Sequence, residues 1–127
     1  MNDFLEQVAE WVREIGLATR RAGDGLLRVT PELGSGVDLR LSVGKLWLRQ
    51  QVPVPSSTTD AAAATACRLV NLTRRGPLAA RWRGKFVELN GSISAADCSR
   101  ETIAWLFKEA LTMRDLLARH LPDDETA

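Results

Sequence analysis

A chain of 127 residues is long enough to bury one hydrophobic core and too short for two, so we expect one domain. Hydrophobic residues make up 45% of the chain and charged residues 26%, a composition typical of globular and not of disordered proteins. A formal net charge of +1 excludes a strong overall field that would attract nucleic acid. Charges interrupt every apolar stretch and the chain starts with acidic residues, so we expect no membrane span, no secretory signal and a cytoplasmic location.

The first part of the chain predicts one helix and three strands. Apolar residues from Phe4 to Ile15 recur at three-and-four spacing, which indicates an amphipathic helix that ends near Gly16. A short strand is expected over 26–30. Residues 37–43 alternate between apolar and polar, as in a strand that is buried on one face. Gly44-Lys45 then offers a two-residue turn into a strand over 46–52.

The middle of the chain predicts a second helix and two further strands. Polar residues with capping side chains precede an alanine-rich helix over 61–74, which Gly76-Pro77 ends. Strand character resumes over 78–89. Asn90-Gly91 is the strongest hairpin signal in the chain and is expected to turn it into a return strand over 92–96.

A last helix is expected over 99–121, because apolar residues form one broad stripe along it and Pro122 stops it. Residues 123–127 then form an acidic tail outside a domain that comprises residues 1–122. The predicted order is helix, three strands, helix, two strands, helix. This order is typical of the α+β class.

That element order resembles the type III secretion chaperone-like fold, and within it the YbjN-like family. The stretch Cys67-Arg68-Leu69-Val70-Asn71, which leads through a basic loop into Gly84-Lys85-Phe86-Val87-Glu88-Leu89-Asn90-Gly91, is part of the resemblance. The resemblance covers nearly the whole chain. It implies an antiparallel sheet flanked by helices, homodimers, and a role as chaperone or adaptor for other proteins without chemistry. Secretion chaperones proper are markedly acidic, so the near-neutral charge of this chain favours the YbjN-like branch.

The sequence offers no set of residues suited to catalysis or metal binding. A hydrolase needs a nucleophile, a base and an orienting group, but His120 is the only histidine and lies in the last turn of a predicted helix, where it complements the helix dipole. Cys67 and Cys98 lack the spacing and the second histidine of a zinc site, so we read both as free thiols in a reducing compartment. We therefore expect no enzyme, no metal and no cofactor.

The predicted turn at Gly44-Lys45 places Arg40 opposite Arg49, with Trp47 beside them on the face away from the apolar residues of 37–43. Two facing arginines repel each other, and an outward tryptophan flanked by arginines is typical of interface hot spots. We therefore predict that Trp47, Arg40 and Arg49 contact a partner protein through an acidic segment. The alternative is that a helix or loop covers this face and makes Trp47 part of the core.

Two helices carry further candidate contacts. The middle helix has small or apolar residues nearly all round, which predicts a cover on more than one side and hence a homodimer contact through Ala63, Cys67 and Val70. In the last helix, Trp105 projects away from the main apolar stripe together with Leu116, so Trp105 is a further candidate partner contact.

The alternative function is binding of single-stranded nucleic acid. Its candidate residues are Arg81, Trp82, Arg83, Lys85 and Phe86. Such a basic run with interleaved aromatic rings can neutralise phosphates and stack on bases. Strand alternation would place the cations on one face and the rings on the other, which favours an ordinary strand with one buried face.

Overall fold

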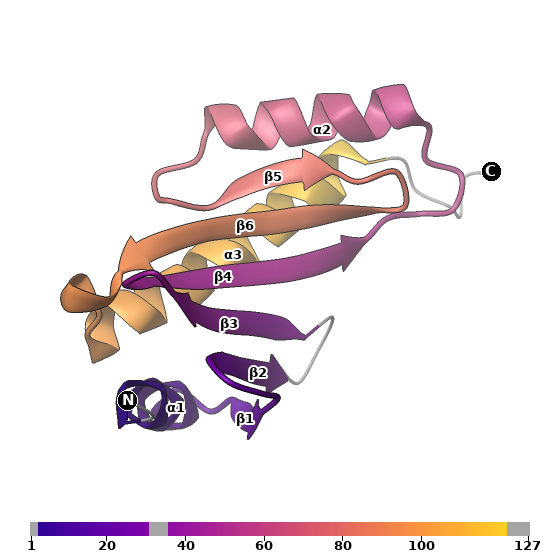
Figure 1. Ribbon diagram of the computed structural model, residues 1–127. Helices are drawn as coiled ribbons and strands as arrows, with labels where there is room; N and C mark the ends of the chain where they lie inside the picture. Colours follow the sequence, from indigo (N-terminus) through magenta and orange to yellow (C-terminus); the bar gives the residue numbers. More distant parts are fainter. Residues whose placement is uncertain (1–2, 31–35, 122–127) are drawn as a thin grey trace.

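The computed structural model describes residues 3–30 and 36–121. Within them the chain forms three α-helices and a six-stranded antiparallel sheet, so the predicted α+β class is confirmed (Figure 1). The elements in chain order are α1 (Asp3–Glu14), β1 (Ala18–Arg21), β2 (Leu26–Thr30), β3 (Val37–Ser42), β4 (Lys45–Pro53), α2 (Asp60–Leu72), β5 (Ala79–Trp82), β6 (Phe86–Ser94), the 3-10 helix η1 (Ala95–Asp97) and α3 (Arg100–His120). The acidic tail predicted for residues 123–127 lies outside the described part.

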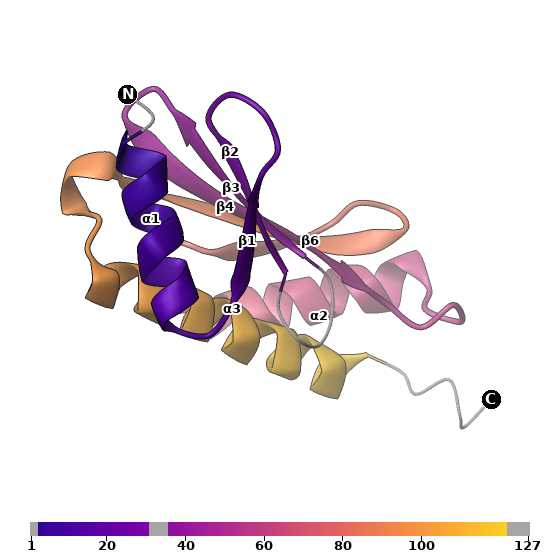
Figure 2. The ribbon, with the colours of Figure 1, turned by 90° about the horizontal axis from the view of Figure 1, so that it is seen from below.

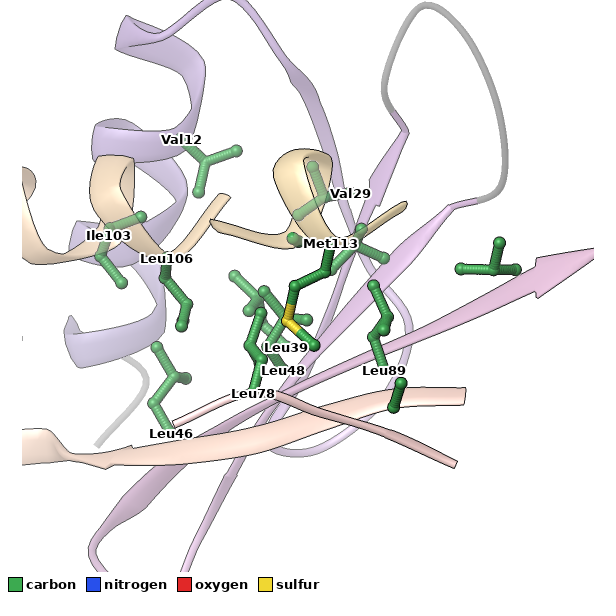
Figure 3. Close-up of a cluster of buried hydrophobic side chains, with 14 of the residues drawn as sticks. Val12, Val29, Leu39, Leu46, Leu48, Leu78, Leu89, Ile103, Leu106 and Met113 are labelled. Carbon is green, nitrogen blue, oxygen red and sulfur yellow. The ribbon is translucent and has the colours of Figure 1, made fainter. Parts of the chain in front are cut away.

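The helices lie on one side of a sheet whose strand order is β1-β2-β3-β4-β6-β5. Figures 1 and 2 show α3 running along the back of the sheet, α1 beside β1, and α2 along the outer edge at β5. The core fills the space between them, where Leu39 and Leu48 of the sheet meet Leu106 and Met113 of α3 (Figure 3). No described helix covers the other face of the sheet, which we call the open face.

Short polar side chains begin α2 and α3 as the sequence indicates. The Oγ1 atom of Thr59 accepts a hydrogen bond from the backbone N–H of Ala62, and the Oγ atom of Ser99 accepts one from Thr102. Each satisfies an N–H group that the first turn of a helix leaves free. Asn71, near the end of α2, bonds both the N–H and the carbonyl of Ala80 in β5. The side-chain amide of Asn71 thus satisfies two backbone groups of β5, which is an edge strand of the sheet.

The turn predicted at Gly44-Lys45 is wrong by one residue. Val43 and Gly44 form the turn, with φ of 53° and 72°, and Ser42 pairs with Lys45. This register places Leu41 opposite Leu46 and Leu39 opposite Leu48. Cross-strand packing of core leucines therefore decides the register over the local preference for glycine at the first turn position.

The hairpin predicted at Asn90-Gly91 is also wrong. The turn lies at residues 83–85, where Gly84 has φ of 92°, and β6 continues through residues 90 and 91 because it pairs with β4 over nine positions. Gly91 has a different role there. A Cβ at Gly91 would collide with the backbone of Pro77 and Leu78, so glycine permits the close approach of these two segments.

Candidate partner-binding face

Trp47 lies on the open face, and its side chain is 38% exposed. Its neighbours along β4, Leu46 and Leu48, point to the other side and are fully buried, as strand alternation requires. The alternative that Trp47 belongs to the core is therefore excluded. The indole instead borders a hollow of about 480 Å³, together with Arg40, Ser42, Val43 and Lys45.

Val43 is the second apolar side chain at this hollow, and the sequence did not single it out. It stands at the tip of the β3–β4 hairpin, 96% exposed, with a positive φ that a β-branched residue rarely adopts. Folding gains nothing from an apolar side chain in this position. Val43 therefore adds to the apolar surface that Trp47 presents.

The two arginines predicted to face each other do not do so, because the turn is shifted. Arg40 pairs with Trp47, and Arg49 pairs with Asp38. A register shift of two residues leaves each side chain on its predicted face, so Trp47, Arg40 and Arg49 still share the open face. The predicted repulsion is absent. A cation beside the indole ring is present instead.

Glu88 of β6 is a buried acid on this face that the sequence did not indicate as a site residue. Its side chain is 4% exposed and accepts contacts from Arg49, whose Nε lies 2.6 Å from Oε1, and from Arg83, whose Nη2 lies 2.8 Å from Oε2. Burial would raise the pKa of Glu88, but the hydrogen bond from Arg83 and the charges of both arginines outweigh it and lower the pKa. Glu88 thus remains ionised and fixes two guanidinium groups.

Basic side chains dominate the open face, as the rows of directly paired residues show. One row runs Arg20, Arg28, Asp38, Arg49, Asn90, Ala79 across the sheet, the next Leu26, Arg40, Trp47, Ser92, and another Gln51, Glu88, Arg81. With Lys45, the described strands contribute six basic and two acidic side chains to this face, an excess of four positive charges in a chain whose net charge is +1. Charge is therefore concentrated on the surface that no helix covers.

The basic-aromatic run proposed for nucleic acid does not form one strand. Arg81 and Trp82 end β5, Arg83 and Lys85 belong to the turn, and Phe86 begins β6. Trp82 pairs with the core residue Val87 and its Nε1 donates to Asp60, whereas Phe86 pairs with Pro53 on the open face. The intervening turn places the two rings on opposite faces, which a continuous strand would not do.

The residues predicted for a homodimer contact are used by the chain itself. Ala63, Cys67 and Val70 are all buried within the single chain. The large apolar side chains that α2 exposes are Leu69, 39% exposed, and Leu72, 76% exposed. The sequence did not distinguish the buried side of α2 from its exposed side, because alanines occupy both sides of the helix.

Trp105 does not join the patch around Trp47. It lies on α3, on the helical side of the sheet, and is 43% exposed. There it borders a cleft of about 480 Å³, whose lining includes Arg74, Arg75 and Lys108. Trp47 and Trp105 therefore present separate surfaces.

The described residues contain no group of three or more histidine, cysteine or acidic side chains placed to hold a metal ion. Cys67 and Cys98 are free thiols, and burial raises the pKa of both, with Asp97 contributing at Cys98, so both stay protonated at neutral pH. No helix in the described part is both long and apolar enough to cross a membrane.

Comparison with solved structures gives clear likenesses of fold. A chain of the ExsC–ExsE complex matches with a TM-score of 0.75 and 19% identity, covering 95% of each chain. The fold is that of the type III secretion chaperones and of YbjN. A chain of the HopA1–SchA chaperone–effector complex has a TM-score of 0.68 and 13% identity, over 93% of this chain and 95% of its own. YbjN from E. coli has a TM-score of 0.60 and 13% identity, over 91% and 89%. No family model and no curated protein matches the chain.

Proposed function

We propose that this protein is a non-catalytic adaptor or chaperone-like protein that binds partner proteins through the open face of its sheet. The observation that carries the proposal is Trp47, half-exposed on a bare sheet beside the cations Arg40 and Arg49. Tryptophan and arginine are the residues most enriched in interface hot spots, because they combine large contact area with directed hydrogen bonding. Val43 extends the apolar part of the same surface.

The solved structures of similar fold support a protein-binding role. Two of them are complexes between two proteins, ExsC with ExsE and HopA1 with SchA. Fold alone does not transfer a function, so the proposal depends on the open face of this chain and uses the likeness as support. The described residues include no group of three or more histidine, cysteine or acidic side chains that could hold a metal ion, which agrees with a role in binding.

We also propose a homodimer, now through the outer side of α2. Leu72 and Leu69 are exposed on that side, and small neighbours such as Ala61 and Ala64 would let a second helix approach closely. Burying two leucines from each copy would remove apolar surface from water. Substitution of Leu72 with glutamate should convert a dimer to a monomer in light scattering without unfolding the chain.

The two half-exposed tryptophans give a matched test of the binding face. Affinity-tagged wild type, Trp47→Ala and Trp105→Ala would be used to capture proteins from a lysate of the organism that carries the gene. The proposal expects a protein that is captured by wild type and Trp105→Ala and lost with Trp47→Ala. Equal capture by all three variants, or loss only with Trp105→Ala, would contradict it.

A further inference from the structure

We propose that the open face recognises a bipartite acidic segment of its partner, with an apolar side chain over Trp47 and carboxylates over a cluster of Arg49, Arg81 and Arg83. This inference rests on the proposed function and assigns the chemistry of the bound segment. Its basis is the arrangement of three arginines around the buried carboxylate of Glu88.

Glu88 holds the cluster together without neutralising it. Arg49 contacts the carboxylate through Nε, Arg83 contacts it through Nε and Nη2, and Arg81 is its directly paired neighbour on β5. One negative charge thus stands among three positive ones, which leaves an excess of two. Glu88 acts as a positioning residue, because it fixes two long side chains that would otherwise lose conformational entropy on binding.

The arginines keep donors free for a ligand. A guanidinium group carries five N–H donors, and the contacts to Glu88 use one of those of Arg49 and two of those of Arg83. The side chain of Arg81 is exposed and makes no hydrogen bond or ion pair to another residue of the described part. Planar guanidinium groups bind carboxylates in pairs of parallel hydrogen bonds, which a partner's Asp or Glu side chain can satisfy.

The distance between the two parts sets the spacing of the segment. Trp47 and Arg49 are two residues apart on β4 and share a face, which separates them by about 7 Å along the strand. Measured from Trp47, Arg81 lies four positions along the strand direction and two strands across the sheet. At usual strand dimensions this separation is about 16 Å. An extended peptide covers these distances with about two to five residues. Carboxylates should therefore follow or precede the apolar residue by two to five positions.

The observations favour a protein segment over a single-stranded nucleic acid. Stacking of successive bases needs aromatic rings at short intervals. The two rings on the open face, Trp47 and Phe86, lie toward opposite ends of the β4–β6 ladder. Trp82 lies on the other side of the sheet. The hollow beside Trp47 is also bordered by the apolar Val43. A peptide with one apolar anchor and one group of acidic side chains therefore fits this surface better than a nucleic acid with its repeating phosphate backbone.

The test uses two labelled decapeptides in a glycine–serine background. The acidic peptide has leucine at position 3 and glutamate at positions 5, 7 and 8. Its twin has the same sequence with glutamine in place of each glutamate. Fluorescence anisotropy would measure both against wild type, Trp47→Ala, Arg81→Gln and the control Arg119→Gln, an exposed arginine in the last turn of α3. The acidic peptide should bind wild type about tenfold more tightly than its twin. Arg81→Gln should remove most of that difference, and Arg119→Gln should change the binding of neither peptide.

Three contrary results can be told apart. If the twins bind equally while Trp47→Ala weakens both, the acidic segment is wrong and the proposed binding face stands. If Trp47→Ala changes neither peptide, the binding face itself is contradicted. A labelled 15-nucleotide DNA strand that binds more tightly than the acidic peptide, with affinity falling steeply as salt rises, would overturn the protein segment in favour of nucleic acid.

Discussion

Replacing Val43 with asparagine should stabilise the protein and weaken its binding to a partner. Val43 has φ of 53° at the first position of a turn whose second residue, Gly44, has φ of 72°. Asparagine followed by glycine is the preferred pair for such a turn, and a β-branched residue is among the least suited. The substitution creates that pair without any other change.

The expected gain follows from the geometry. A positive φ costs an L-residue about 1–2 kcal/mol, most of which asparagine avoids by local hydrogen bonding. The side chain of Val43 is 96% exposed, so its removal forfeits almost no buried surface. We therefore expect the free energy of unfolding to rise by about 1 kcal/mol, which corresponds to about 3–5 °C in Tm for a chain of this size.

Urea denaturation at pH 7, followed by tryptophan fluorescence, would measure the change. Gly44→Ala is the matched control, because it introduces a Cβ at positive φ in open space and should destabilise the same turn by about 1 kcal/mol. Unchanged or reduced stability of Val43→Asn would refute the reasoning. Because Val43 is part of the proposed binding face, the stabilised variant should also capture less of the partner protein. A role of Val43 in the turn alone would leave partner capture unchanged.

Four further substitutions test other parts of the structure. Glu88→Gln should destabilise the protein by about 1–2 kcal/mol at pH 7, because it removes ionic contacts to Arg49 and Arg83. The pKa of Glu88 is lowered in the folded state, so this contribution is fully present above the pKa of Glu88 in the unfolded chain and is lost as pH falls through the lower folded pKa. Urea denaturation should therefore show the gap to wild type closing as the solution is acidified. Gly91→Ala should cost about 2 kcal/mol in thermal melting, since the clashing atoms of Pro77 belong to the backbone and cannot rotate away; an unchanged Tm would contradict the close approach. Val70→Glu should unfold the chain by burying an unpaired carboxylate, whereas Leu72→Glu should leave circular dichroism intact, and similar melting of both variants would show that α2 is oriented differently.

The sequence predicts the elements that carry apolar periodicity or clear boundary residues and misses those with neither. α1, α3 and β3 follow from spacing, α2 from its capping residues and alanine content, and β2 and β4 from the turns and prolines that bound them. β1 was not predicted, because Ala18–Arg21 contains no large apolar residue. Polar contacts to α1 accompany it, from Arg13 to Thr19 and from Arg21 to Glu6, and such contacts leave no periodic signal in the sequence.

Both turn errors have one cause, because turn residues were read locally while the sheet is decided by long-range pairing. Asn90-Gly91 has the composition of a hairpin turn, yet β6 must run on to pair with the whole of β4. The face of Trp47 survived these errors, since alternation within β4 does not depend on the turn. Glu88 was missed for the same reason. A turn placed at Gly84 would have set Arg81 opposite Glu88 and suggested an arginine cluster.

Photo-crosslinking in cells tests the central claim most directly. A photoreactive amino acid at Ser92, which is paired with Trp47 on the open face, would be compared with one at Thr112, which borders the cleft beside Trp105. The open-face account predicts that a partner protein is crosslinked from position 92 and not from position 112. A partner crosslinked from position 112 alone would contradict it and would place the binding surface on the helical side of the molecule.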